Sequence, residues 1–264
     1  MIKKIKLFVN HNDQSMRLAK LVKENFVAHG FIVTDDSFDL GIAIGGDGAF
    51  LRMAKQSNYD PNVYYVGINA GTLGFLQEVN ASEIDKLIYV LQNEIYKVDE
   101  MSVQQTDIHH HNKIGRIYSL NEIIVRDEEL KTTKLDVLID DSLLEHFVGD
   151  GLMISTSIGS TGHNLSYGGS IVYSGMPTLQ ITPLAPINSR AFHTIKTSVI
   201  IPEKKEIVLL PVDYTKNIML TADGESTIYK NVDGITTAIK DKKIKCLRLK
   251  NYNFSQKVND KLLS

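Results

Sequence analysis

The feature that most constrains the fold is an apolar run that passes through a glycine-rich turn into a helical pattern. Residues Leu40 to Ile44 form the run, Gly45-Gly46-Asp47-Gly48 forms the turn, and Phe50 to Met53 begins the helical pattern. A buried strand joined in this way to a helix is the repeating unit of α/β layers with parallel strands. The turn therefore predicts an α/β layer in this part of the chain.

The rest of the first third repeats the alternation of strand and helix patterns. Short β-branched runs predict strands, and apolar residues at helical spacing predict helices. We expect strands over Ile5 to Val9, Phe31 to Val33 and Val63 to Ile68, and helices over Gln14 to Ala28 and Ser82 to Leu91. Ser82 and Asp85 have the spacing of a capping box for the second helix.

Beyond about Ile95 the pattern changes to many short strands separated by polar turns. Such spacing is typical of β-rich domains. The expected strands are Gly115 to Val125, Leu135 to Ile139, Leu143 to Phe147, Thr197 to Ile201, Glu206 to Leu210 and Asn217 to Thr221. A short amphipathic helix is expected over Phe254 to Leu263.

These patterns predict two domains of different class. We expect an α/β N-terminal domain with a parallel, Rossmann-like sheet and a β-rich, sandwich-like C-terminal domain. The α/β domain is placed at residues 1–94 and the β-rich domain at 95–240. A C-terminal tail, 241–264, is expected to pack back on the N-terminal domain.

Composition narrows the classes of partner. The 264 residues carry 29 Lys and Arg against 31 Asp and Glu, so neither a nucleic acid nor an anionic membrane is an expected partner. No apolar stretch is long enough for a signal-peptide core or a membrane span. The single Cys246 cannot form an internal disulfide, which favours a reducing compartment. We expect a cytoplasmic protein.

The glycine-rich turn carries the strongest local chemical signal. Three glycines in four positions allow backbone N–H groups to approach a phosphate, at the N-terminus of the helix that follows. A carboxylate there would repel phosphate unless it faces a metal ion or an attacking hydroxyl, as in phosphoryl transfer. A tight turn with Asp47 as a helix N-cap explains the turn alone equally well. The sequence lacks both the P-loop motif and the G-x-G-x-x-G motif, which disfavours a hydride-transferring Rossmann enzyme.

A second group of glycine and hydroxyl residues runs from Gly149 to Gly169. Small residues beside an apolar strand suit hydrogen bonds to sugar and phosphate oxygens, so a ligand loop is favoured over an ordinary surface loop. The adjacent pair Asn121-Glu122 interrupts a strand pattern, and one of the two side chains is expected to face inward. An edge strand remains an alternative for that pair.

Taken together, these motifs resemble the NAD kinase family, and the resemblance spans nearly the whole chain. The matching segments are GGDGAFLR at Gly45 to Arg52, GINAGTLGFL at Gly67 to Leu76, SLNE at Ser119 to Glu122, GDGL at Gly149 to Leu152, GSTGHNLS at Gly159 to Ser166, ITPLAP at Ile181 to Pro186 and ADGE at Ala222 to Glu225. A GGDG turn alone is shared with lipid kinases and phosphofructokinases. The ordered set is specific.

The resemblance implies a kinase that moves the γ-phosphoryl of ATP to the 2′-hydroxyl of the adenosine ribose of NAD, with a divalent cation such as Mg²⁺. It implies that Asp47 accepts the proton, that Asn121 and Glu122 hold the ribose or adenine side, that Asp150 holds ribose hydroxyls, and that a homodimer or homotetramer forms. No dedicated protein metal site is expected. The implied substrate-binding residues are Gly46, Gly48, Arg52, Asn69, Phe75, Asn121, Glu122, Val148, Asp150, Ser157, Thr161, Gly162, His163, Asn164, Leu165, Ser166, Ala185 and Glu225.

The chain departs from the family pattern at a few of these positions. Ala49 replaces the common Thr, Ser157 replaces Pro, Gly162-His163 replaces Ala-Tyr, and Val148 stands where a basic residue is frequent. An imidazole at His163 can still stack on adenine, with less area than a phenol. None of these changes affects Asp47.

Two other functions are less consistent with these motifs than NAD phosphorylation. A lipid kinase with a GGDG turn would need an apolar acceptor channel, whereas the second loop is polar. A non-catalytic NAD sensor would not need a carboxylate beside phosphates. The run His109-His110-His111 is interpreted as a solvated turn between strands, because three consecutive side chains cannot converge on one ion.

Overall fold

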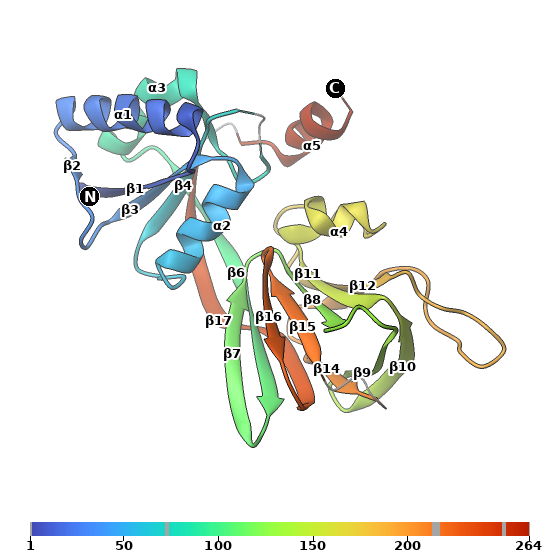
Figure 1. Cartoon of the computed structure of the whole chain (residues 1–264). Helices are drawn as coiled ribbons and strands as arrows, with labels where there is room; N and C mark the ends of the chain where they lie inside the picture. The colour runs from blue at the N-terminus through green and yellow to red at the C-terminus, as the bar shows by residue number, and fades with distance from the viewer. Residues whose placement is uncertain (1, 72–73, 213–216, 250–251, 264) are drawn as a thin grey trace. The chain divides into compact units, whose positions relative to one another are not determined.

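The computed structural model describes residues 2–71, 74–212, 217–249 and 252–263, so Thr72 and Leu73 of the GINAGTLGFL segment lie outside the described residues. The chain divides into two compact units. The first unit combines Met1–Met101 with Lys243–Ser264, and the second is Ser102–Lys242. Two long strands, β6 (Lys97–His110) and β17 (Val232–Arg248), contribute residues to both (Figure 1).

The first unit is built on a parallel sheet. Its strands follow the order β17-β4-β3-β1-β2, with β5 paired to the far end of β4, and every one of these pairs is parallel. The bounds are β1 Lys4–Val9, β2 Ile32–Val33, β3 Leu40–Gly45, β4 Tyr64–Asn69 and β5 Val79–Asn80. All six residues of β3 are buried, as expected for a central strand covered on both faces.

Helices cover the two faces of this sheet (Figure 1). Helices α1 (Asp13–Ala28) and α3 (Ile84–Gln92) lie together on one face, and α2 (Asp47–Gln56) lies on the other against β1 and β3. The last helix, α5 (Phe254–Leu262), also belongs to this unit. None of the helices in the described ranges is both long enough and apolar enough to span a lipid bilayer.

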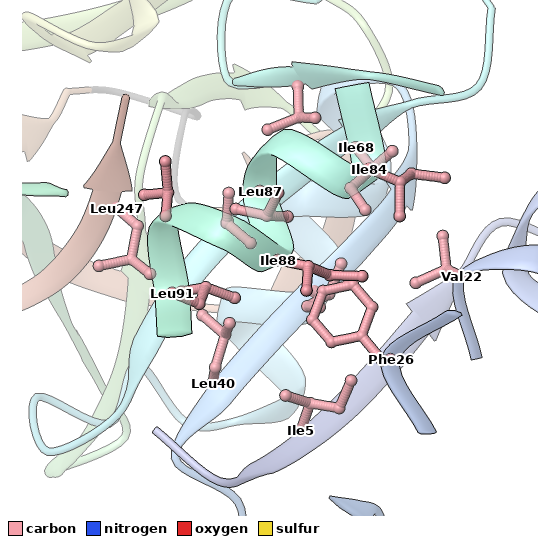
Figure 2. Packing of buried hydrophobic residues seen from close by; sticks show 14 of the residues in the cluster. Ile5, Val22, Phe26, Leu40, Ile68, Ile84, Leu87, Ile88, Leu91 and Leu247 are labelled. Atoms are coloured by element: carbon pink, nitrogen blue, oxygen red, sulfur yellow. The ribbon is translucent and has the colours of Figure 1, made fainter. Parts of the chain in front are cut away.

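The core of the first unit lies between the sheet and the α1–α3 face. One buried cluster joins Phe26 of α1, Ile88 of α3 and Leu40 of β3 (Figure 2). The ring of Phe26 is fully buried, and its centroid lies 5.2 Å from that of Phe31. Periodic apolar residues in the sequence thus form the contact between the helices and the sheet.

The second unit contains an antiparallel sheet of order β13-β12-β11-β8-β15-β16. Its strands are β8 Glu122–Asp127, β11 Gly151–Thr156, β12 Thr178–Leu184, β13 Val199–Pro202, β15 Ile218–Ala222 and β16 Glu225–Tyr229. A short 3₁₀ turn, η2 (Gly159–Thr161), and the single-turn helix α4 (His163–Ser166) follow β11.

A second group of strands in this unit forms the other layer. It contains β9 Thr133–Ile139, β10 Ser142–Gly149, β14 Ile207–Pro211 and β7 Lys113–Ser119, together with parts of β6 and β17. One hydrophobic cluster combines Val125 and Ile154 of the first sheet with Val137 and Leu209 of this group. Two layers that share one core form a sandwich. The predicted fold class, an α/β unit with a parallel sheet and a β-rich unit, is confirmed.

Local details differ from the sequence predictions. The capping box is formed by Asn80 and Glu83 at the 3₁₀ turn Ala81–Glu83, and not by Ser82 and Asp85. Helix α2 begins at Asp47, with Gly46 as its N-cap, so Asp47 itself is not the cap. Helix α2 begins before the predicted Phe50, whereas α3 begins at Ile84, after the predicted Ser82, because the 3₁₀ turn Ala81–Glu83 precedes it.

Two strand predictions also need correction. The single strand expected over Gly115 to Val125 is two strands, β7 and β8, that are separated at Leu120 and Asn121. His109 and His110 lie within β6, and only His111 lies in the turn to β7. The two histidines belong to β6 because they pair with Ile114 and Lys113 of β7 in an antiparallel hairpin.

Replacing Phe26 with Ala should lower the free energy of unfolding by about 3–5 kcal/mol, because a fully buried ring leaves a cavity against Phe31 and α3. Denaturant unfolding followed by circular dichroism measures the change. The neighbouring substitution Val27→Ala is the control, since that side chain is 53% exposed and should change stability by no more than about 0.5 kcal/mol. Equal effects from both substitutions would contradict this packing.

Candidate functional site

The first group of predicted site residues lies at the carboxyl ends of β3 and β4. We call Gly45–Gly48 the phosphate loop; it joins β3 to the N-terminus of α2. Gly45 pairs with Asn69, the last residue of β4. The buried Asn69 is held by its own turn, since its Nδ2 donates to Gly71 O at 2.8 Å. Ligands of open parallel sheets bind at this edge, so these residues lie where a substrate is expected.

The carboxylate of Asp47 is fixed by backbone donors from a distant segment, Gly74–Gln77, which we call the anchoring segment. Phe75 N donates to Oδ2 at 2.7 Å, and Leu76 N donates to Oδ1 at 2.8 Å. A Cβ at Gly74 would lie 1.8 Å from Asp47 Oδ1, so only glycine permits this approach. The Asp47 side chain therefore has one defined orientation at the start of α2.

The anchoring segment also holds the backbone of the phosphate loop. The buried Gln77 donates from Nε2 to Gly46 O at 2.9 Å. Arg52 of α2 donates to Asn10 Oδ1 at 2.8 Å, and its guanidinium lies beside Gly48. Arg52 is exposed and thus available to an anion near the loop.

The second group of predicted residues surrounds the break between β7 and β8. Asp223, in the turn between β15 and β16, accepts hydrogen bonds from Leu120 N and Asn121 N, both at 2.8 Å. Thr156 N in turn donates to Asn121 O at 2.8 Å. A Cβ at Gly159 would lie 2.3 Å from Asn121 O, which requires glycine there. Backbone contacts thus fix the Asn121-Glu122 pair against the start of the 159–169 segment.

Several polar atoms of this group are buried without a hydrogen-bond partner in the described part of the chain. They are Asn121 Oδ1, Glu122 Oε2 and Asn164 Nδ2. Asn164 is otherwise fixed, because its Oδ1 accepts from Thr182 Oγ1 at 2.6 Å. Unsatisfied buried polar atoms are rare in proteins, and three in one loop cluster indicate a polar ligand. We call Asn121, Glu122, His163 and Asn164 the polar cluster.

His163 and Glu122 are the ionisable members of the polar cluster. His163 Nδ1 lies 4.0 Å from Glu122 Oε1, and the half-exposed imidazole packs against the Tyr167 ring with centroids 5.0 Å apart. Glu122 is almost completely buried. Burial and, to a smaller extent, the charge of Asp223 together raise the pKa of Glu122 to about 8.

The remaining predicted residues of the second unit divide between the two ends of β11. Ser157, Thr161, Gly162, Leu165 and Ser166 lie beyond its last residue, beside the polar cluster. Val148, Asp150 and Ala185 lie at its first residue, where Asp150 N donates to Leu184 O at 2.9 Å. Six strand residues separate the two ends by roughly 20 Å. The buried Val148 side chain belongs to the strand core, whereas Asp150 and Ala185 are exposed.

Glu225 occupies a third position, at the start of β16 directly after the Asp223-Gly224 turn. Its side chain is exposed. Asp223, two residues earlier, holds the polar cluster in place, although the sequence motif ADGE gave no reason to separate the roles of its two carboxylates. Gly74 and Gln77 were likewise not singled out, because their roles depend on contacts with Asp47 and Gly46.

Comparison with known proteins decides the family. Residues 6–96 match the family described as ATP-NAD kinase N-terminal domain, and residues 120–247 match the ATP-NAD kinase C-terminal domain. An NAD kinase from Finegoldia magna is 38% identical, with 98% of this chain and 97% of that protein covered. This chain belongs to the NAD kinase family.

Solved structures of NAD kinase relatives have the same fold. Yeast NADH kinase complexed with NADH gives a TM-score of 0.83 at 18% identity, covering 98% of this chain and 87% of that one. An NAD kinase from Archaeoglobus fulgidus in complex with ATP gives a TM-score of 0.75 at 20% identity, covering 99% of this chain and 98% of that one. These likenesses extend across both units of the chain.

Replacing Glu122 with Gln should remove a pH dependence from stability. The folded pKa of about 8 exceeds the ordinary value, so between about pH 4.5 and 8 the folded state binds more protons than the unfolded state. Stability from this group is therefore lost as pH rises through that window, by roughly 2–5 kcal/mol.

Urea unfolding at pH 5.5 and pH 8.5 measures this effect. Relative to the wild type, Glu122→Gln should gain stability at the higher pH. Asp233→Asn, which removes an exposed carboxylate from the same unit, is the control and should not alter the pH dependence. Parallel pH profiles for wild type and Glu122→Gln would contradict the assignment.

Proposed function

We propose that this chain phosphorylates NAD with ATP and that Asp47 is the general base. As the 2′-oxygen of the adenosine ribose attacks the γ-phosphorus, an O–P bond forms and the bond from the γ-phosphorus to the β,γ-bridging oxygen breaks. The electron pair of that broken bond remains on ADP, and the ribose proton passes to an Asp47 oxygen. The products are NADP and ADP.

The fixed Asp47 carboxylate is the observation that carries this proposal. An ionised carboxylate offers about four lone-pair sites, and the backbone N–H groups of Phe75 and Leu76 use two. The others remain available to a hydroxyl. Because the carboxylate is already held in place, little reorganisation is required when the acceptor hydroxyl arrives. Phosphoryl transfer depends chiefly on such positioning and on electrostatic stabilisation.

We assign the dinucleotide to the polar cluster of the second unit. Its three unpartnered buried atoms, Asn121 Oδ1, Glu122 Oε2 and Asn164 Nδ2, supply two acceptors and one donor for ribose and adenine groups. His163 offers a half-exposed ring for stacking on adenine. A glutamic acid that keeps its proton near neutral pH could also donate a hydrogen bond. Gly48 and Arg52 are assigned to the phosphates.

Mg²⁺ fits this site as a partner of the phosphates. Across the described residues, no three His, Cys, Asp or Glu side chains gather into a possible cation cage. Magnesium commonly binds through one or two carboxylates together with substrate phosphates and water. Asp47 is the carboxylate placed to hold it, and the ion would offset negative charge on the triphosphate.

The proposed location is the cytoplasm. Cys246 is buried and free, in keeping with a reducing compartment. Burial raises the pKa of its thiol to about 12, so the thiolate that would react with disulfides does not form readily.

Replacing Asp47 with Asn should lower turnover by about 10²–10⁴-fold, or about 3–5 kcal/mol of barrier, because an amide cannot accept the proton. NAD affinity should remain within about threefold. The amide can satisfy only one of the two backbone N–H groups, so stability should fall by roughly 1–3 kcal/mol. A coupled NADP assay and calorimetric NAD titration measure the two effects.

Asp39→Asn is the matched control for this substitution. The Asp39 carboxylate also accepts two backbone hydrogen bonds, from Lys3 N and Lys4 N at 2.8 Å, but it lies before β3, away from the phosphate loop. Both bonds are to Oδ2, so the amide oxygen of the introduced asparagine can still accept them, and Asp39→Asn should lose only their charge assistance and keep its turnover. Near-normal turnover in Asp47→Asn, or an equal loss in both variants, would exclude the base role.

We further propose a homodimer or homotetramer in which Asp150 and Ala185 serve the site of a neighbouring subunit. The two ends of β11 support this, because Asp150 lies roughly 20 Å from the polar cluster of its own chain. Large apolar side chains are also exposed nearby in sequence, at Tyr173, Met176 and Phe192. Exposed apolar groups of this kind often mark subunit contacts.

Mixing two inactive variants tests this arrangement. Asp47→Asn and Asp150→Ala should each be inactive alone, while mixed subunits after exchange should regain up to about one quarter of wild-type activity, because some sites then combine both intact residues. Sedimentation establishes the size of the assembly. A monomer at active concentrations, or no recovery in mixed oligomers, would refute the shared site.

A further inference from the structure

Helix α5 contributes two lysines to the first unit that the proposed reaction has not used. Lys257 donates from Nζ to Gln77 O at 2.5 Å. Gln77 itself holds Gly46 O through its side chain. Lys257 is thus connected through a single residue to the phosphate loop.

Lys261 lies one helical turn further along α5 and faces the anchoring segment. Its Nζ is removed from solvent and has no hydrogen-bond partner among the described residues. The Nζ lies 5.4 Å from the centre of the Phe75 ring. The same Phe75 donates its backbone N–H to Asp47. Lys261 therefore lies beside the residue that anchors the Asp47 carboxylate.

The Lys261 ammonium group lacks a hydrogen-bond acceptor among the described residues, and an anion could supply one. Lysine has three donors and no acceptor, and a donor without a partner costs free energy when it is removed from water. Burial lowers the pKa of Lys261, whereas the charges of Asp47 and Asp260 oppose that shift. Burial and the positive charge of Arg248 lower the pKa of Lys257 to about 8, whereas the negative charges of Glu78 and Asp47 oppose that shift. An added anion would stabilise the charged form of both lysines.

We propose that Lys261 binds a terminal phosphate oxygen of the ATP donor and that Lys257 is a positioning residue that holds the anchoring segment. This inference rests on the proposed function, in which the γ-phosphoryl must lie beside Asp47. A lysine supplies a compact charge that contacts phosphate without a fixed plane, which suits a group that changes partner during transfer. The donor, rather than NAD, is the expected ligand because Lys261 adjoins Phe75 and the phosphate loop.

Lys261→Met should weaken the binding of ATP and of inorganic tripolyphosphate by about tenfold or more, as expected for a lost charge-assisted hydrogen bond. Tripolyphosphate contains no nucleoside, so calorimetric titration with it reports the phosphate subsite alone. Lys261→Arg should restore affinity to within about threefold. NAD affinity should stay within about twofold in both variants. Lys23→Met, which removes an exposed charge on α1, should leave all three affinities unchanged.

Thermal unfolding separates binding from a structural role. Removing an unpartnered buried ammonium should leave the unfolding temperature of the free protein unchanged or higher, while the rise induced by ATP should shrink. Lower stability with unchanged tripolyphosphate affinity would assign Lys261 a structural role and overturn the proposal, as would an equal loss of NAD affinity. If Lys261→Met does not fold, Lys261→Gln provides the same comparison.

The same titrations distinguish this inference from the proposed function. Tripolyphosphate binding that depends on Lys261, in a wild-type protein that forms no NADP from NAD and ATP, would leave the lysine assignment standing and reject the reaction. NADP formation together with tripolyphosphate affinity that is insensitive to Lys261→Met would support the proposed reaction and reject the lysine assignment.

Discussion

The site in the first unit depends on one interaction, the acceptance of two backbone hydrogen bonds by the Asp47 carboxylate. Each carboxylate–amide bond is charge-assisted and thus stronger than a neutral one. The pair joins the start of α2 to the anchoring segment, and Gly74 is required because any Cβ there would overlap the carboxylate. Gln77 and Lys257 extend the same connection to Gly46 and α5. A single acidic residue therefore organises both the phosphate loop and its surroundings.

In the second unit a different aspartate, Asp223, also accepts hydrogen bonds from the backbone of a distant segment. Asp223 accepts hydrogen bonds from Leu120 N and Asn121 N, and so fixes the break between β7 and β8 where the polar cluster lies. The Asp223 charge also helps to keep Glu122 protonated. In both units a carboxylate accepts hydrogen bonds from the backbone of a distant segment, although our proposal gives a reacting role to Asp47 alone. Asp223 shapes the binding site without being a reacting group.

The parts of this structure that were predictable are those that depend on neighbouring residues. The run Leu40 to Ile44, the glycine turn and the periodic apolar residues of α1 are local signals, and they identified the parallel sheet and its helices. The contacts that complete the site are long-range: Phe75 is 28 residues from Asp47, and Leu120 is 103 residues from Asp223. No local pattern marks Gly74, Gln77 or Asp223 for these roles.

Unmet hydrogen-bonding capacity is shared by several of the residues that we propose to bind the nucleotides. Arg248, although nearly buried, is fully engaged by Glu78 and Asp99 at 3.0 and 3.1 Å, so its charge supports the fold of the first unit. Asn121 Oδ1, Glu122 Oε2 and Lys261 Nζ lack such partners in the described residues. Each costs free energy in the ligand-free protein, and a ligand that supplies the missing partner recovers that cost on binding. In our proposal the substrates supply these missing partners, so the unpaired atoms of the polar cluster and of Lys261 contribute to nucleotide binding.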